Sequence, residues 1–152
     1  MSKNPSVAIH PTLFMFLWVV LAFGLQYLWP LQLPELALLG LFGKIGLVLG
    51  GLIMIWAQIV FRRHDTTTEH SKPTTSLIVD GPFRFSRNPI YVALIVIFIG
   101  LAMVYRNAWG LILVIPFGIA VLRFTIMPEE EYLEREFRAE YTHYRSSVRR
   151  WL

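Results

Sequence analysis

The sequence predicts an all-α integral membrane protein, in which a bundle of four transmembrane helices is followed by an amphipathic cytoplasmic helix. Of its 152 residues, 55% are hydrophobic and 16% are charged, and the mean hydropathy is +0.54. The hydrophobic residues form long unbroken runs, and the charged residues lie between these runs. This pattern excludes an intrinsically disordered chain and a soluble domain with apolar residues at helix or strand period.

The first two hydrophobic runs predict two membrane helices, since about 30 Å of hydrocarbon takes roughly 20 helical residues. The first helix is expected at residues 12–29. We do not expect a cleavable signal peptide here, because the run lacks a small-residue cleavage site and follows a single lysine, Lys3. The second run extends from about residue 36 to 61 and contains Lys44. We expect Lys44 to reach the interface, which places the membrane span at residues 45–61.

The third and fourth runs predict a helical hairpin. They cover residues 90–105 and 109–127, and only residues 106–108 separate them. A polar loop, residues 62–89, precedes the hairpin, and a polar tail follows it. Since there is no internal repeat, the sequence predicts one membrane domain over residues 1–152.

The basic residues predict the orientation in the membrane. The links at residues 31–35 and 106–108 hold one arginine between them, whereas the loop at 62–89 and the tail hold five basic residues each. Both termini and both polar segments are therefore expected on the cytoplasmic side, at the inner membrane if the protein is bacterial. The same asymmetry accounts for the net charge of +4, which is too small and too dispersed to indicate nucleic-acid binding. Nothing in the sequence indicates an oligomeric state.

Several kinds of site are excluded or not expected. The absence of cysteine excludes disulfides, thiolate metal sites and a cysteine nucleophile. His64 and His70 lie near Asp65 and Glu69, but their spacing fits no recurrent ligand pattern, and we expect no metal site. No Gly-x-Gly-x-x-Gly follows a strand, so a doubly wound nucleotide-binding domain is not expected either.

The tail, residues 128–150, is expected to form one amphipathic helix that begins at Pro128. Apolar side chains recur every three or four residues along this helix and just after it, at Leu133, Phe137, Tyr141, Tyr144, Val148 and Trp151. Such a stripe predicts a lid that lies on the lipid headgroups or on the loop above the bundle.

Two glutamates at the start of the tail are candidate binding residues. Glu131 can pair with Arg135 in the next turn, as can Glu134 with Arg138, but Glu129 and Glu130 have no such partner. They stand at the head of the apolar stripe, so we expect them to face inward. Stabilisation of the helix dipole by acidic residues accounts for their position equally well.

The end of the polar loop, residues 81–91 with the sequence GPFRFSRNPIY, combines two turns with cationic and aromatic side chains. Gly81-Pro82 predicts a turn, and Asn88-Pro89 starts the third membrane helix. Between them two arginines alternate with two phenylalanines. Arginines and helix-start N–H groups at the mouth of a bundle can bind a carboxylate or a phosphate. Positive-inside anchoring alone explains this composition about as well.

This segment, with Glu129-Glu130-x-x-Leu133 and Phe137-x-x-x-Tyr141-x-x-Tyr144 downstream, resembles the isoprenylcysteine carboxyl methyltransferase and phospholipid methyltransferase group of integral-membrane enzymes that use S-adenosylmethionine. The resemblance covers about the last 85 residues. It departs from the group's pattern at Arg138, where a glycine is usual, and at Arg149, where a proline is frequent.

The resemblance implies an S-adenosylmethionine-dependent methyltransferase acting on a lipophilic acceptor from the bilayer. The acceptor could be a small molecule or a lipidated substrate that carries a carboxylate, amine, phenol or thiol. The cofactor-binding residues it implies are Gly81, Pro82, Arg87, Asn88, Pro89, Tyr91, Glu129 and Glu130. Tyr91 and Arg123 are the candidate catalytic residues, and we expect substrate and cofactor to meet around them. An arginine at this depth usually faces a partner or a cavity, although Arg123 could equally reach the headgroups.

Two other functions remain open. A membrane reductase would hold a nicotinamide dinucleotide through the arginine-rich loop and reduce a lipid, but Glu129 and Glu130 would repel its pyrophosphate if they faced the same pocket. A non-enzymatic scaffold or transport subunit predicts polar residues across the bilayer, and the central thirds of the predicted helices have almost none.

Overall fold

The computed structural model describes residues 11–63 and 77–152, and all the regular structure in these residues is helical. The expected all-α fold is therefore confirmed. In chain order the elements are α1 (Pro11–Leu28), α2 (Ala37–Arg63), a 3₁₀ turn η1 (Gly81–Arg84), α3 (Pro89–Val104), α4 (Ala108–Val121), a π-helical segment η2 (Leu122–Ile126) and α5 (Met127–Ser147). Three helical stretches are long and apolar enough to cross a membrane: α1, α2, and the continuous stretch of α4, η2 and α5. Helix α3 is apolar but has only 16 residues.

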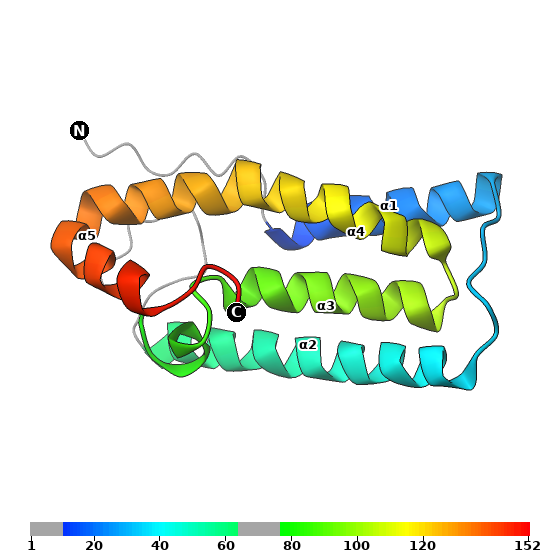
Figure 1. Ribbon diagram of the computed structural model, residues 1–152, viewed down its shortest axis with the longest axis horizontal. Helices are drawn as coiled ribbons and strands as arrows, with labels where there is room; N and C mark the ends of the chain where they lie inside the picture. The colour runs from blue at the N-terminus through cyan, green and yellow to red at the C-terminus, as the bar shows by residue number, and fades with distance from the viewer. Residues whose placement is uncertain (1–10, 64–76) are drawn as a thin grey trace.

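Helices α1 to α4 alternate in direction along the long axis of the molecule (Figure 1). Helix α2 packs on α3, α3 on α4, and α4 on α1. As a result, the end of α2, the start of α3 and the start of α5 all lie toward one end of the bundle (Figure 1). This end holds the polar segments that the sequence singled out.

Packing in the bundle uses aromatic side chains on one side and glycines on the other. Phe98 of α3 meets Phe117 of α4 edge to face, with ring centroids 5.3 Å apart. Between α2 and α3 the backbones approach closely, as shown by Gly50: a Cβ atom there would lie only 3.0 Å from the Ala93 carbonyl oxygen. Together these contacts fix α3, whose first residues belong to the candidate site.

The opposite end of the bundle is closed by the loop between α3 and α4. The Asn107 side chain accepts a hydrogen bond from the Gly110 N–H at 3.0 Å and donates one to the Ala22 carbonyl of α1 at 3.1 Å. Asn107 is buried, so it both caps α4 and ties α1 to the hairpin.

The helix bounds differ from the expected spans in two places. Helix α2 begins at Ala37, eight residues before the predicted span at 45–61, and the exposed Lys44 lies inside it. A leucine-rich segment with a lysine is a good helix former whether or not it lies in lipid. The fourth predicted span, 109–127, ends in the π-helical segment η2 and continues into α5 without a break.

The tail also differs from the single helix expected at 128–150. Helix α5 ends at Ser147 and is broken at Arg138, where φ is 41° and ψ is −110°. The chain folds back there, and Arg145 Nη1 lies 3.1 Å from Glu134 Oε2. In a straight helix, residues eleven positions apart would be separated by about 16 Å. Glu134 thus meets Arg145 and not the expected Arg138, while the expected pair of Glu131 and Arg135 is confirmed at 3.2 Å.

Candidate functional site

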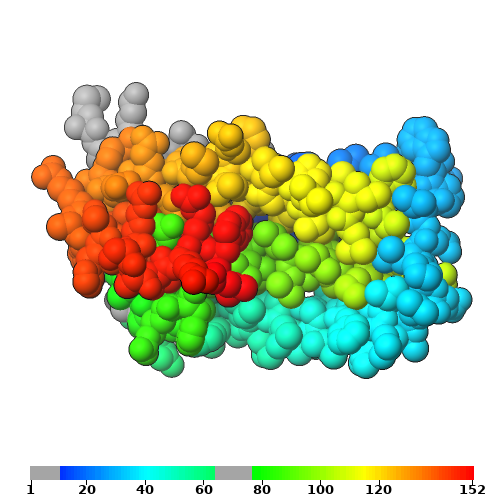
Figure 2. Space-filling view, in the orientation of Figure 1, coloured from blue at the N-terminus to red at the C-terminus, as the bar shows by residue number. Residues whose placement is uncertain are grey.

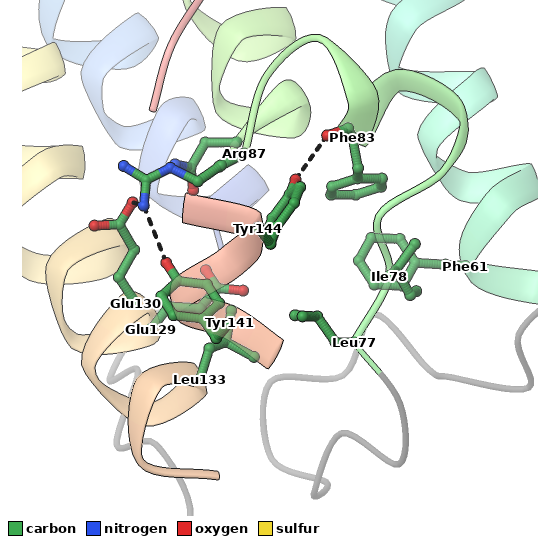
Figure 3. Close-up of a pocket in the computed structure, with 11 residues that line it drawn as sticks. Phe61, Leu77, Ile78, Phe83, Arg87, Glu129, Glu130, Leu133, Tyr141 and Tyr144 are labelled. Carbon is green, nitrogen blue, oxygen red and sulfur yellow. Dashed lines mark hydrogen bonds and ion pairs between the residues drawn. The ribbon is translucent and has the colours of Figure 1, made fainter. Parts of the chain in front are cut away.

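A pocket lies at the polar end of the bundle, between the end of α2, the loop before α3, and α5 (Figure 3). It encloses about 580 Å³ of empty space, its open mouth included. Its walls are formed by Phe61, Leu77, Ile78, Phe83, Arg87, Asn88, Glu129, Glu130, Leu133, Tyr141 and Tyr144. The pocket therefore has an apolar side toward α2 and a charged side where α3 and α5 meet.

The loop that carries Arg87 is fixed on α2 by two contacts. Gly81 has a positive φ of 58° and sits so close to α2 that an added Cβ would lie 2.5 Å from Cγ2 of Val60. Both features favour glycine at this position. Two residues later, the buried Phe83 packs edge to face on Phe61, with centroids 5.4 Å apart. A loop held in this way places Arg87 in a defined position at the start of α3.

Arg87 and Glu130 form the charged centre of the pocket. Arg87 Nη1 lies 3.4 Å from Glu130 Oε1, and the two side chains are only 8% and 10% exposed. The same Nη1 donates a hydrogen bond to the Tyr141 hydroxyl at 3.4 Å (Figure 3). Arg87 Nε is buried and has no hydrogen-bond partner among the described residues. A buried donor of this kind usually has an acceptor, so a ligand with an anionic group would complete the site.

Glu129 is held by a hydrogen bond from α3. Tyr91 in the first turn of α3 donates its hydroxyl hydrogen bond to Glu129 Oε2 at 2.9 Å. The helix-dipole explanation for Glu129 and Glu130 needs a free helix N-terminus. However, α5 continues from η2, and the Met127 N–H is bonded to the Leu122 carbonyl. The two glutamates therefore lie within a continuous helical stretch, and dipole stabilisation is not their main role.

Two tyrosines from the folded-back half of α5 cover the pocket. The Tyr144 hydroxyl donates a hydrogen bond to the Phe83 carbonyl at 2.7 Å, and the Tyr141 and Tyr144 rings pack against each other. Burial raises the pKa of Tyr144 well above its usual value. Burial and the charge of Glu130 also raise the pKa of Tyr141, against the opposite effect of Arg87. Both hydroxyls therefore remain protonated at neutral pH.

The C-terminal strap, residues 148–151, crosses the loop before α3. The Arg87 N–H donates to the Arg149 carbonyl at 3.0 Å. Ser86 Oγ and Asn88 Nδ2 donate to the Arg150 carbonyl at 3.3 Å and 3.1 Å. Figure 2 shows the C-terminal residues (red) lying on this loop (green). The expected contact between tail and loop is therefore present in the structure.

Arg150 makes the strongest ionic contact of the site. Its Nε lies 3.2 Å and 3.1 Å from the two carboxylate oxygens of Glu130, and its Nη2 lies 2.8 Å from Oε2. These hydrogen bonds raise the pKa of Arg150 above its usual value. Sequence reasoning missed this residue, because one of two adjacent arginines near the end of a tail carries no sign of a partner twenty positions away.

The sequence-predicted residues occupy different places around the pocket. Arg87, Asn88, Glu129 and Glu130 line the pocket. Tyr91 does not line it but donates a hydrogen bond to Glu129. The remaining residues of the loop motif, Gly81, Pro82 and Pro89, are not among its walls and shape the turns on either side of Arg87.

Arg123 lies away from the pocket, and its side chain is exposed. Arg123 and Glu130 are seven residues apart, and a straight α-helix would place them on one face. Arg123 itself lies in the π-helical segment η2 (Leu122–Ile126), whose wider turns break the α-helical register, and it is exposed whereas Glu130 is buried. The structure therefore does not bring Arg123 together with the other candidate residues.

Comparison with known proteins identifies the family. An uncharacterized protein of Haemophilus influenzae is 36% identical over 63 residues, which are 41% of this chain and 100% of that protein. No solved structure matches the chain. The model of the phospholipid methyltransferase family matches residues 39–140, which include most of α2, the loop motif and both pocket glutamates. Since this match covers more than half of the chain, the protein belongs to the phospholipid methyltransferase family.

Proposed function

We propose that the protein is an integral-membrane methyltransferase that uses S-adenosylmethionine to methylate a lipophilic acceptor. The family supports membrane methyl transfer in general. The observation that carries the more specific proposal is the composition of the pocket. It combines a buried arginine, two carboxylates and an apolar wall in one space.

The groups that line the pocket fit the polar and apolar parts of the cofactor. Arg87, whose buried Nε has no acceptor in the described part of the chain, suits the methionyl carboxylate. Glu129 and Glu130 supply oxygens that can accept hydrogen bonds from an ammonium group or from ribose hydroxyls. Apolar side chains such as Phe61 and Ile78 suit an adenine ring.

The residues of the chain would promote the reaction by positioning and by excluding water. When bound, the cofactor supplies a methyl group on a positively charged sulfur. The carboxylates on α5 favour a cationic group in the pocket. Tyr141 and Tyr144 close the side of the pocket that the folded-back half of α5 covers, which keeps water from the reacting groups. Tyr91 holds Glu129 and is proposed to stand near the acceptor.

The acceptor is proposed to reach the pocket from the bilayer and the cofactor from the cytoplasm. Phe61 lies at the end of α2, and many other large side chains of that helix are exposed and apolar, as expected for contact with lipid. An apolar wall that continues into a lipid-facing helix offers a lipophilic molecule a route into the site. We place the pocket and both termini on the cytoplasmic side, from the basic residues around the pocket.

The structure weakens the alternative of a dinucleotide-dependent reductase. That function requires the arginine-rich loop to bind a pyrophosphate. Glu129 and Glu130 line the same pocket as Arg87, so two carboxylates would face the phosphates and repel them.

The test is methyl transfer by the protein reconstituted in lipid vesicles. It would be incubated with S-adenosylmethionine carrying a radiolabelled methyl group, first with total membrane lipid and then with a cytosolic small-molecule extract. We expect label in the organic-solvent extract of the lipid reaction and its loss in Arg87→Ala. Label in the water-soluble pool alone would contradict a bilayer acceptor, and label in neither pool would contradict the proposed activity.

A further inference from the structure

We propose that Arg150 is a positioning residue of the cofactor site, which holds the Glu130 carboxylate in place and keeps the Arg87 guanidinium available for an anionic group of the ligand. This inference rests on the proposed function. It concerns a residue outside the stretch 39–140 that the family model matches.

Arg150 and Glu130 form an ion pair with a two-point geometry. Arg150 contacts both oxygens of Glu130, at 3.2 Å, 3.1 Å and 2.8 Å. The Glu130 side chain is 10% exposed, whereas that of Arg150 is 35% exposed. A two-point contact fixes the plane of a carboxylate as well as its position. The partly exposed arginine thus orients the nearly buried glutamate.

The Glu130 carboxylate is contacted unequally by Arg150 and Arg87. Glu130 is shared by two arginines, but Arg87 approaches only one of its oxygens, at 3.4 Å. The closer contact with Arg150 supplies hydrogen bonds to both oxygens of the carboxylate and a positive charge next to it. Without Arg150, the buried carboxylate would have Arg87 as its remaining cationic partner among the described residues, and the two would draw together. Arg87 would then be neutralised inside the pocket and would bind a ligand carboxylate less well.

The C-terminal strap is held in place by contacts that do not involve the Arg150 side chain. The carbonyls of Arg149 and Arg150 accept hydrogen bonds from the backbone of Arg87 and the side chains of Ser86 and Asn88. Trp151 packs against the hydrophobic core formed by α1, α3, α4 and η2. These contacts use the backbone of the strap and the Trp151 ring. A substitution of the Arg150 side chain therefore leaves the strap in place and removes only the ionic contact.

The test compares the binding of S-adenosylhomocysteine to detergent-purified full-length variants by calorimetric titration. Arg150→Ala should weaken binding by about tenfold or more, the effect of losing one charge-assisted contact. Arg150→Lys keeps the charge but not the two-point contact, so its loss should be smaller. Arg149→Ala is the matched control, because the Arg149 side chain is exposed and the strap uses only its carbonyl.

The second arm asks whether Arg150 acts through Glu130. In a Glu130→Gln background, Arg150→Ala should change the affinity by less than about threefold, since the ionic contact is already lost. An equal loss in both backgrounds would show a general structural role and overturn the proposal. Unchanged binding in Arg150→Lys and in a folded Arg150→Ala would also overturn it. If the unsubstituted protein failed to bind S-adenosylhomocysteine, the proposed function itself would fall, which separates the two failures.

Discussion

Arg87 and Glu130 are nearly buried opposite charges that lie 3.4 Å apart in the candidate pocket. Replacing Arg87 by Ala, or Glu130 by Gln, should weaken the binding of S-adenosylhomocysteine by about 1 to 3 kcal/mol, the range for losing a charge-assisted hydrogen bond. Calorimetric titration of the purified variants measures this loss. The matched control is Glu131→Gln, because Glu131 pairs with Arg135 on the surface. If Glu131 mattered as much as Glu130, the assignment of the pocket glutamates would be wrong.

Arg138 adopts a backbone conformation that suits glycine. Its φ of 41° is unfavourable for a residue with a Cβ atom, at a cost of about 1–3 kcal/mol, and its side chain is exposed. Arg138→Gly should therefore stabilise the protein by about 1 kcal/mol after the greater entropy of glycine in the unfolded chain is subtracted. Thermal unfolding in detergent, followed by circular dichroism, measures the change.

The control for Arg138 is Glu136→Gly, an exposed position with helical backbone two residues earlier. Glycine there should destabilise the protein by about 0.5–1 kcal/mol. The positive φ at Arg138 would be contradicted if glycine lowered the unfolding temperature equally at both positions.

Individual site residues could be predicted from the sequence only where a local pattern marks them. Arg87 and Asn88 stand out in a short loop between two turns, and Glu129 and Glu130 have no basic residue three or four positions later in the sequence. Arg150 could not be found, because its pairing with Glu130 depends on the reversal of the chain at Arg138. Arg123 was placed at the site because an arginine at membrane depth usually faces a partner or a cavity, but it is exposed and does not line the pocket.

At the scale of the helices, hydropathy and turn residues predicted most of the architecture. The hairpin of α3 and α4 follows from two apolar runs joined by a short link. Helix α3 lies within one residue of its expected bounds, whereas α4 ends at Val121 and the expected span continues through η2. The start of α2 at Ala37 was not predicted, because a helix can begin several residues before the segment that lies in lipid. The break in α5 lies in a polar, helix-favouring segment, so local propensity gives no sign of it.

The seam between α2 and α3 depends on close backbone approach. A Cβ atom at Gly50 would meet Cγ1 of Ile97 at 2.6 Å and the Ala93 carbonyl oxygen at 3.0 Å. Gly50→Ala should destabilise the bundle by about 1–3 kcal/mol, the cost of overpacking a tight interface. Denaturant unfolding in detergent measures this effect.

Gly51 is the matched control for this seam, because a Cβ atom there would meet nothing within 4 Å. Gly51→Ala should leave stability unchanged or raise it by up to about 1 kcal/mol, through the better helix propensity of alanine. Equal effects at Gly50 and Gly51 would contradict the packing of α2 on α3.

At the scale of the whole molecule, the polar and charged residues of the site lie at one end of an apolar bundle (Figures 1 and 3). We predict that this end faces the cytoplasm. Cysteine-accessibility mapping is direct because the chain has no cysteine. In intact cells, an impermeant thiol reagent should label Gln32→Cys and not Ser146→Cys. Both positions are exposed. Asn107, which pairs with Gln32 in an isolated β-bridge, is buried and therefore unsuitable for labelling. The reverse labelling pattern would move the site to the other side of the membrane.

The proposed function requires the pocket between the loop before α3 and the tail to bind S-adenosylmethionine. The most direct measurement is a pair of calorimetric titrations of the detergent-purified protein, one with S-adenosylhomocysteine and one with NADPH. We predict saturable binding of S-adenosylhomocysteine that is weakened by Arg87→Ala, and no binding of NADPH. Binding of NADPH without binding of S-adenosylhomocysteine would contradict the claim and favour a reductase.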